Sequence, residues 1–523
     1  MRAREHGPPS EGEVRLLASL TSGGPGFYAL LGLLLGLIAW GIIAYSLQLR
    51  YGLGVTGLRD SMMWGVYITN FVFFIGVSHV GALMSAILRI TGAEWRRPIT
   101  RMAEAITFAS LLMGALMPVV DMGRPERLLN LVLHGRLQSP ILWDILSIAT
   151  YLTGSTLFLY VPMIPDIALL RDHFADGPAW RRRLYTVLAL GWRGTKAQRR
   201  YLEAIMGVMA VLIIPIAVSV HTVVSWIFAM TLRAGWNSTI FGPYFVSGAL
   251  FSGAAAVVTA MAAFRWAYHL EDYITESHFR RMGYLVIALG MIYGYFTFAE
   301  YLTPAYKMAL HERGYLMAVF AGTFSRLFWF TQVVGVLLPI LLLTLPRISW
   351  VPRLQRIPLL QPRPVLAATA ASAALLLATS VAGSSTAALG EVATARTVLV
   401  WLVAAMGGWS FLALLPVFHR RPITTAFVAS VLVNVGAWAK RYVIIVPTLQ
   451  NPFLPIQNAP PVWRTYKPTW VEWSITAAAL AGFLLIYILF SKLFPIVSIW
   501  ETREAASEPR TPVREEAPDA QAM

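Results

Sequence analysis

The chain is a succession of long apolar segments separated by short polar connections. Most segments last about 20 residues or more, which at about 1.5 Å per helical residue matches the roughly 30 Å hydrocarbon core of a bilayer. Their number excludes a single membrane anchor. The sequence therefore predicts an all-α polytopic membrane protein.

The composition supports this class and excludes others. With 57% hydrophobic and 13% charged residues, the 523 residues cannot cover a water-soluble globule with polar surface. The formal charge of +16 could suggest nucleic acid, but the cations lie in short loops between apolar segments, so no nucleic-acid partner is expected. Without cysteine there is no disulfide, no thiolate-held iron–sulfur cluster and no cysteine nucleophile, so any redox centre needs histidine ligands or another subunit.

The pattern divides the chain into five parts. We expect a cytoplasmic N-terminal tail over 1–25, a membrane domain over 26–345, an inserted hairpin over 346–420, final transmembrane helices over 421–494 and a disordered cytoplasmic tail over 495–523. Within the hairpin, Ala367 to Gly383 is Ala-rich and short for a span, whereas Val398 to Phe418 is long enough, so the expected count is ten to twelve transmembrane helices. The last part is rich in Glu, Ala and Pro and cannot bury a core.

The loop charges predict the orientation. The N-terminal tail and the second and fourth loops carry more than twice as many Lys and Arg as the loops between them. By the positive-inside rule the N-terminus is cytoplasmic, and an even number of spans returns the C-terminus to that side. The loop from Asp121 to Pro140 is then outside.

His79 is the ionisable residue nearest the middle of the second apolar segment, which runs from about Met63 to Ile90. Imidazole exchanges protons near neutral pH, so His79 could accept a proton from a quinol hydroxyl. The alternative is a histidine that only hydrogen-bonds a neighbouring helix. Ionisable groups inside a membrane are functional by default.

Several residues of the same segment are candidates to line a quinol site with His79. Trp64 and Tyr67 open the segment, as interfacial aromatic residues do. An apolar wall shares the helix face of His79, and its one small residue, Gly76, would let a flat ring approach. The wall consists of Ile68, Val72, Ile75 and Gly76.

Carboxylates lie near the outer ends of the third and fourth spans. Asp121 could relay protons to water, and Arg124 could orient it, line the quinol site or contact a partner protein. The alternative is an interfacial ion pair beside a turn built by Gly123 and Pro125. Asp144 lies in the first turns of span four, where the helix dipole alone also favours a carboxylate.

His221 lies deep in the fifth span and belongs to a possible proton pathway. Together with His79 it could in principle ligate a b-type haem. The other histidines fall in loops or at span ends, too few and too peripheral for a two-haem protein. We therefore expect no haem in this chain.

The second half carries a weaker proton-pathway signal. Glu300 and Tyr301 end the seventh span on the outer side, and Lys440 and Arg441 lie in the next-to-last long span. The two cations could instead extend toward a membrane interface while their stems stay in lipid.

Several motifs occur together in a fixed order. They are Ser78-His79-Val80-Gly81 with Ile87-Leu88-Arg89, Arg97-Pro98-Ile99-Thr100-Arg101 with Ala103-Glu104-Ala105, Gly123-Arg124-Pro125, Ser139-Pro140 with Leu142-Trp143-Asp144, Ser219-Val220-His221, and Gly242-Pro243-Tyr244-Phe245. In this order the chain resembles the NrfD / polysulfide-reductase membrane-subunit family, and within it most closely the membrane subunits of alternative complex III.

This resemblance implies two four-helix bundles, spans two to five and six to nine, with the first bundle over about 63–230. It implies a quinol site in the first bundle, beside an iron–sulfur subunit on the outer side. There we expect menaquinol or ubiquinol to be oxidised, with His79, Asp121 and Asp144 as the catalytic residues. It implies no haem or iron–sulfur cluster in the chain itself. Family members typically have about ten spans, so the part from 346 to 420 is a departure.

The resemblance also implies partners in a bacterial cytoplasmic membrane. They are a periplasmic iron–sulfur subunit of the molybdopterin-oxidoreductase type, a homologous NrfD-like membrane subunit and multihaem cytochrome c subunits. Proton translocation by the complex is a further expectation. An anchor of a molybdopterin oxidoreductase, or a proton or solute transporter, is the alternative. No pair of Gly/Pro-broken short helices recurs in the two halves as in many transporters.

Overall fold

The computed structural model describes residues 11–231, 233–348, 367, 371, 391–452 and 460–507. Within these residues the chain is helical and forms no β-strand, and ten stretches are long and apolar enough to cross a membrane. The expected all-α polytopic class is confirmed. The ten stretches are built from α2 (Pro25–Tyr51), α3 (Val66–Ile90), α4 (Arg97–Asp121), α6 (Pro140–Tyr160), α9 (Lys196–Ala229), α10 (Phe241–Tyr268), α11 (Glu276–Lys307), α13 (Ser325–Gln332) with α14 (Leu338–Thr344), α17 (Pro422–Gln450) and α18 (Trp470–Leu493).

The remaining elements are mostly short and connect these helices or cap their ends, the exception being α16 with 30 residues. The α-helices are α1 (Glu11–Ser19), α5 (Asn130–Leu133), α7 (Ile164–His173), α8 (Ala179–Leu188), α12 (Leu310–Phe320), α16 (Glu391–Arg420) and α19 (Ile499–Ser507). The 3₁₀-helices are η1 (Gly52–Val55), η2 (Glu94–Arg96), η3 (Pro125–Arg127), η4 (Val161–Met163), η6 (Leu345–Arg347) and η9 (Pro461–Arg464). A π-turn, η5 (Val333–Leu337), joins α13 to α14.

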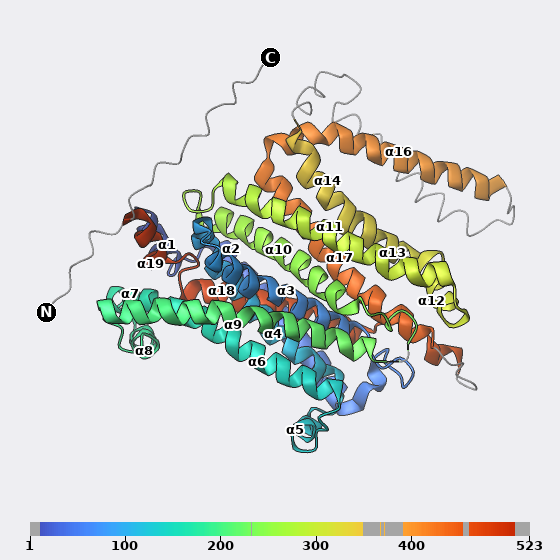
Figure 1. Ribbon diagram of the computed structural model, residues 1–523, viewed down its shortest axis with the longest axis horizontal. Coiled ribbons are helices and arrows are strands. Elements are labelled where there is room, and N and C mark those ends of the chain that lie inside the picture. The colour runs from blue at the N-terminus through green and yellow to red at the C-terminus, as the bar shows by residue number, and fades with distance from the viewer. Residues whose placement is uncertain are drawn as a thin grey trace, which may run out of the picture.

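The spans form two four-helix bundles that meet at α3 and α10 (Figure 1). Helices α3, α4, α6 and α9 pack together as the first bundle, and α10, α11, α13 with α14, and α17 as the second. Helices α2 and α18 form a pair that packs beside α3 and α4. The expected two bundles with peripheral helices are confirmed, and α3 is the most buried of the ten spans.

Small residues let the helices approach closely, as is common between membrane helices. A Cβ on Gly81 of α3 would collide with the backbone carbonyl of Ala103 and the hydroxyl of Thr107, both on α4. In the second bundle Gly335 of η5 and Gly436 of α17 pack backbone against backbone. These contacts hold α3 firmly in the first bundle and so fix the direction of its side chains.

The chain after α18 folds back onto the end of the membrane domain. Asp166 accepts hydrogen bonds from Arg101 at 2.6 Å and from the first backbone N–H groups of α19. Glu501 of α19 lies 3.6 Å from Arg96. The expected disordered tail therefore does not begin at 495, because 499–507 form α19 and Glu501 in it is buried beside Arg96. Residues 508–523 lie outside the described residues.

The expected insertion is only partly visible. Residues 391–420 form α16, whereas most of 349–390 lies outside the described residues, so the inserted hairpin and the choice between ten and twelve spans stay predictions. In the expected N-terminal tail, residues 11–19 form α1, whose Leu16 is fully buried.

Candidate functional site

The ring of His79 lies in the middle of α3 and is 2% exposed. Its Nδ1 is 2.5 Å from the backbone oxygen of Ile75. A carbonyl oxygen only accepts, so Nδ1 carries the hydrogen and the neutral ring presents the lone pair of Nε2. Nε2 has no hydrogen-bond partner among the described residues. The arrangement leaves one proton-accepting atom free inside the first bundle.

Two rings from neighbouring helices touch His79. The centroid of the His221 ring on α9 is 4.5 Å away, and that of Tyr151 on α6 is 5.0 Å away. The Tyr151 hydroxyl donates to the backbone oxygen of Ser78 at 3.0 Å. The structure thus brings the two predicted intramembrane histidines together and adds Tyr151, which the sequence pattern did not single out.

Asp144 lies on the same helix as Tyr151, two turns nearer the helix start. It is 6% exposed, and its Oδ1 has no hydrogen-bond partner in the described structure. A separation of seven residues at about 1.5 Å per residue puts the two about 10 Å apart along α6 on one face. The signal for Tyr151 was therefore its spacing from Asp144.

The other predicted carboxylate lies at the end of α4. Oδ1 of Asp121 is buried without a hydrogen-bond partner, and the ion pair with Arg124, which was the alternative interpretation, is not formed within 4.0 Å in the described structure. Arg124 is exposed. Gly123 has φ +68°, the left-handed conformation that suits glycine in this turn.

The expected apolar wall of α3 is buried, but it packs against other helices. A Cβ on Gly114 of α4 would lie 2.8 Å from the side chain of Ile75. A Cβ on Gly76 would lie 3.4 Å from Nη2 of Arg441 and 3.8 Å from Cε1 of His221. The space before Gly76, which we expected to admit a flat ring, therefore holds the Arg441 guanidinium. Val72 is also buried.

The two aromatic residues at the start of the segment have different surroundings. Trp64 is half-buried, with ring contacts to Phe228 at 5.4 Å and Trp236 at 5.8 Å. Tyr67 is fully buried and donates to Oε1 of Gln48 at 2.7 Å, so its ring packs against protein at the start of α3. Gln48 in turn donates to the last turn of α4.

A second polar cluster lies between α11 and α17. Nζ of Lys440 donates to the Tyr301 hydroxyl at 3.0 Å, and Oε2 of Glu300 has no hydrogen-bond partner among the described residues. Lys440 and Arg441 are 2% and 4% exposed, so the interpretation that they extend to an interface is wrong. The Tyr315 hydroxyl on α12 is 3.4 Å from that of Tyr301, and burial raises the pKa of Tyr315.

The histidine pair does not have the geometry of a haem site. The two rings meet at 61° with centroids 4.5 Å apart, which is direct ring contact and leaves no space for a porphyrin between them. In the part of the chain that the structure describes, no group of three or more His, Asp or Glu side chains is placed to hold a metal ion.

Comparison with known proteins identifies relatives. The family model described as "Polysulphide reductase, NrfD" matches residues 54–354. A candidate membrane subunit of a dimethyl sulfoxide reductase from Halobacterium salinarum is 28% identical over 64% of this chain and 72% of its own length. A selenate reductase subunit of Mesobacillus selenatarsenatis is 26% identical over 59% and 72% of the two chains. An Hdr-like menaquinol oxidoreductase integral membrane subunit of Archaeoglobus fulgidus is 22% identical over 62% and 72%.

Proposed function

The chain belongs to the polysulphide reductase NrfD family, and from this we propose that it is the quinol-binding membrane subunit of an electron-transfer complex, in which quinol is oxidised beside His79. The observation that carries the proposal is the free Nε2 lone pair of His79, buried at mid-span in the first bundle. A buried acceptor without a partner is costly unless a ligand or proton uses it.

Quinol oxidation removes two electrons and two protons, and the residues of the first bundle can accept and pass on the protons. Nε2 of His79 accepts a proton from a quinol hydroxyl, and Tyr151 and His221 enclose the ring that becomes charged. Asp144 takes the proton onward toward the start of α6 and the water beyond it. Each proton must leave before His79 can accept the next. Because His79 is almost fully buried, quinol reaches it only when neighbouring side chains move.

The electrons must leave the chain. With no cysteine it cannot hold an iron–sulfur cluster through thiolates, and the two central rings lie too close to enclose a haem. We propose that a partner iron–sulfur subunit of the molybdopterin-oxidoreductase type accepts the electrons at the end where Asp121 and Asp144 lie. This proposal is supported by the reductase names of two relatives.

The relatives' names also bear on the substrate and the complex. One relative is named a menaquinol oxidoreductase subunit, which supports menaquinol over ubiquinol. Two are named as subunits of reductases, which favours a reductase complex. The alternative is that the chain belongs to an assembly of the alternative complex III type, with a second NrfD-like subunit and multihaem cytochromes c.

The polar cluster of the second bundle favours an additional role in proton movement. Lys440 and Glu300 are ionisable and buried in facing helices. The Tyr301 hydroxyl lies between Lys440 and the Tyr315 hydroxyl of α12, so the exchangeable groups extend to α12. Such a series of exchangeable groups is typical of proton relays within membranes. We propose that this bundle moves protons while the first bundle oxidises quinol.

The test of the site is quinol:acceptor turnover by the intact complex with His79→Ala. Loss of a general base costs about a hundredfold to ten-thousandfold in rate, so turnover should nearly vanish while the subunits still co-purify. Ser85→Ala, which removes a buried hydroxyl from the same helix, should turn over like the wild type. Wild-type rates in His79→Ala would remove the reaction from this site.

A further inference from the structure

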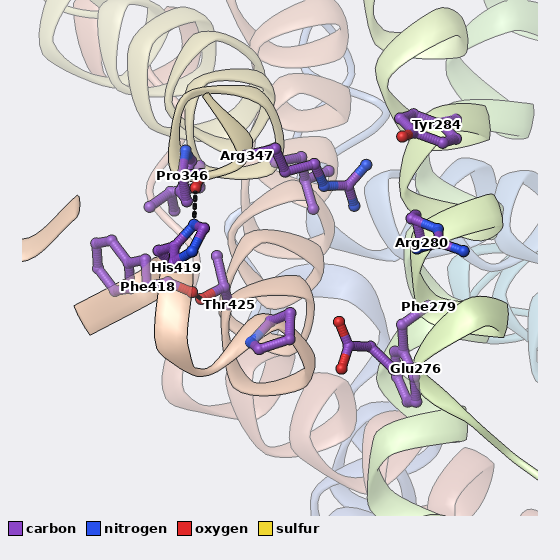
Figure 2. A pocket seen from close by; sticks show the side chains of 12 residues that line it. Glu276, Phe279, Arg280, Tyr284, Pro346, Arg347, Phe418, His419 and Thr425 are labelled. Carbon is purple, nitrogen blue, oxygen red and sulfur yellow. Dashed lines mark hydrogen bonds between the residues drawn. The ribbon is translucent and has the colours of Figure 1, made fainter. Parts of the chain in front are cut away.

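A cavity of about 290 Å³ lies far from His79, in the second bundle. Its walls come from the first turns of α11, the end of α14 with η6, and the turn that joins α16 to α17 (Figure 2). Nothing in the proposed quinol chemistry uses it. Its lining combines cations with apolar side chains, which is the combination that a lipid headgroup site requires.

The cavity lies at the level where membrane spans end. Helix α11 begins at Glu276, and η6 ends its span at Arg347. The same end of the molecule holds α1, because Arg15 of α1 lies 3.4 Å from Asp272 in the loop before α11. This is the end for which the loop charges predict a cytoplasmic location, and there the leaflet carries anionic lipids.

Two arginines supply the positive charge. Arg280 and Arg347 are exposed, and neither makes a hydrogen bond or ion pair with another described residue. The Arg347 guanidinium lies over the ring of Tyr284 at 4.7 Å. A Cβ on Gly283 would lie 2.8 Å from Nη2 of Arg347, so this glycine lets the guanidinium lie directly on α11, the helix that carries Arg280.

The remaining polar groups leave the cavity positive. Glu276 is the carboxylate in the lining, and its place in the first turn of α11 is favoured by the helix dipole. Figure 2 shows His419 bonded through Nδ1 to the carbonyl of Pro346, which fixes the Nδ1 hydrogen and ties the α16 end to η6. Two permanent cations thus face one carboxylate.

The apolar surroundings continue from the cavity toward the membrane centre. Phe279, Leu342 and Phe418 line it. Along α11 the exposed apolar side chains form a track of Tyr284, Met291, Ile292, Tyr295 and Phe298. From Tyr284 to Phe298 the helix rises about 21 Å at about 1.5 Å per residue, which suits an acyl chain.

We propose that the cavity binds the phosphate of an anionic phospholipid between Arg280 and Arg347, with the acyl chains along the exposed face of α11. Guanidinium groups bind phosphate oxygens through two parallel hydrogen bonds, and neither arginine donates a hydrogen bond to another described residue. The inference uses neither His79 nor Asp144 and stands independently of the quinol site.

The experiment is native mass spectrometry of the full-length chain in detergent, titrated with cardiolipin or with phosphatidylcholine. We expect the wild type to retain cardiolipin in preference to phosphatidylcholine. The double variant Arg280→Gln with Arg347→Gln should bind cardiolipin about tenfold more weakly, since each charged hydrogen bond contributes appreciably to affinity. Lysine at both positions keeps the charge and should retain part of the binding.

The matched control is Arg182→Gln with Arg183→Gln, which removes two exposed arginines of α8 outside the cavity and should leave cardiolipin binding unchanged. Equal binding by wild type and the Arg280/Arg347 variant would overturn the proposal, as would equal retention of both lipids. Displacement of cardiolipin by excess inorganic phosphate would show a free-anion site and would also overturn it. A circular-dichroism melt of each variant establishes that it is folded.

Discussion

The two nitrogens of His79 show how much a sequence can say about one residue. Its position within an apolar segment marked it as a candidate, and the ionisable types at 144 and 221 were found in the same way. The sequence could not show that Nδ1 is bonded to its own helix while Nε2 is left free, because this depends on the ring orientation. Tyr151 was missed because a tyrosine in a span is common and carries no charge signal.

For Arg441 the sequence position suggested an alternative interpretation that the structure contradicts. It lies nine positions before the end of α17, near enough to a span end to suggest that it extends to water. The side chain instead turns to the face shared with Gly76 and His221. Which face a cation occupies depends on helix packing, and no local pattern encodes it.

Replacing Asp144 tests the proposed proton exit. An amide in Asp144→Asn keeps the shape but cannot exchange a proton, so quinol turnover should fall by about tenfold or more and lose part of its pH dependence. Asp144→Glu restores a carboxylate and should recover most of the rate. Stopped-flow turnover of the intact complex across a pH series measures both effects.

Glu300→Gln is the control for Asp144, because it removes a buried carboxylate from the second bundle only. Its quinol oxidation should match the wild type even if proton movement changes. An Asp144→Asn enzyme with an unchanged rate and pH profile would mean that protons leave by another route.

At the scale of elements, hydrophobic length predicted the helices well. The segment expected from Met63 to Ile90 is α3 from Val66 to Ile90, because a bilayer-spanning length fixes both ends closely. Three short elements, α12, α19 and the π-turn η5, were not predicted, because contacts with neighbouring helices define them rather than hydrophobic length. The two bundles followed from family resemblance, not from the apolar pattern.

The close contact of α3 with α4 gives a stability prediction. In Gly81→Ala the added methyl meets the backbone of Ala103, which cannot move without shifting α4. The free energy of unfolding should therefore fall by about 1–3 kcal/mol. Gly32→Ala on α2 is the control, since nothing lies within 4 Å of a Cβ there. Alanine is favoured over glycine in a helix by about 1 kcal/mol, so this control should be neutral or slightly stabilising. Thermal unfolding in one detergent compares the two, and an equal melting temperature for Gly81→Ala would mean that α4 yields without cost.

For the whole molecule, the ends of the bundles differ in charge and in contacts. One end carries α1, α19 and the Arg96–Glu501 and Arg101–Asp166 pairs, and the cavity lined by Arg280 and Arg347 lies there. The other end carries the carboxylates Asp121 and Asp144. The architecture therefore separates the proposed proton exit from the basic end.

The loop charges predict the orientation: the basic end is expected in the cytoplasm, because Lys and Arg resist translocation. The chain contains no native cysteine, so single cysteines report without background. Gln138→Cys, exposed before α6, should react with a membrane-impermeant maleimide added to intact cells, whereas Glu271→Cys, exposed before α11, should react only after the membrane is opened. The reverse pattern would place Asp144 and the proposed electron-accepting partner on the cytoplasmic side, and the Arg280 and Arg347 cavity in the outer leaflet.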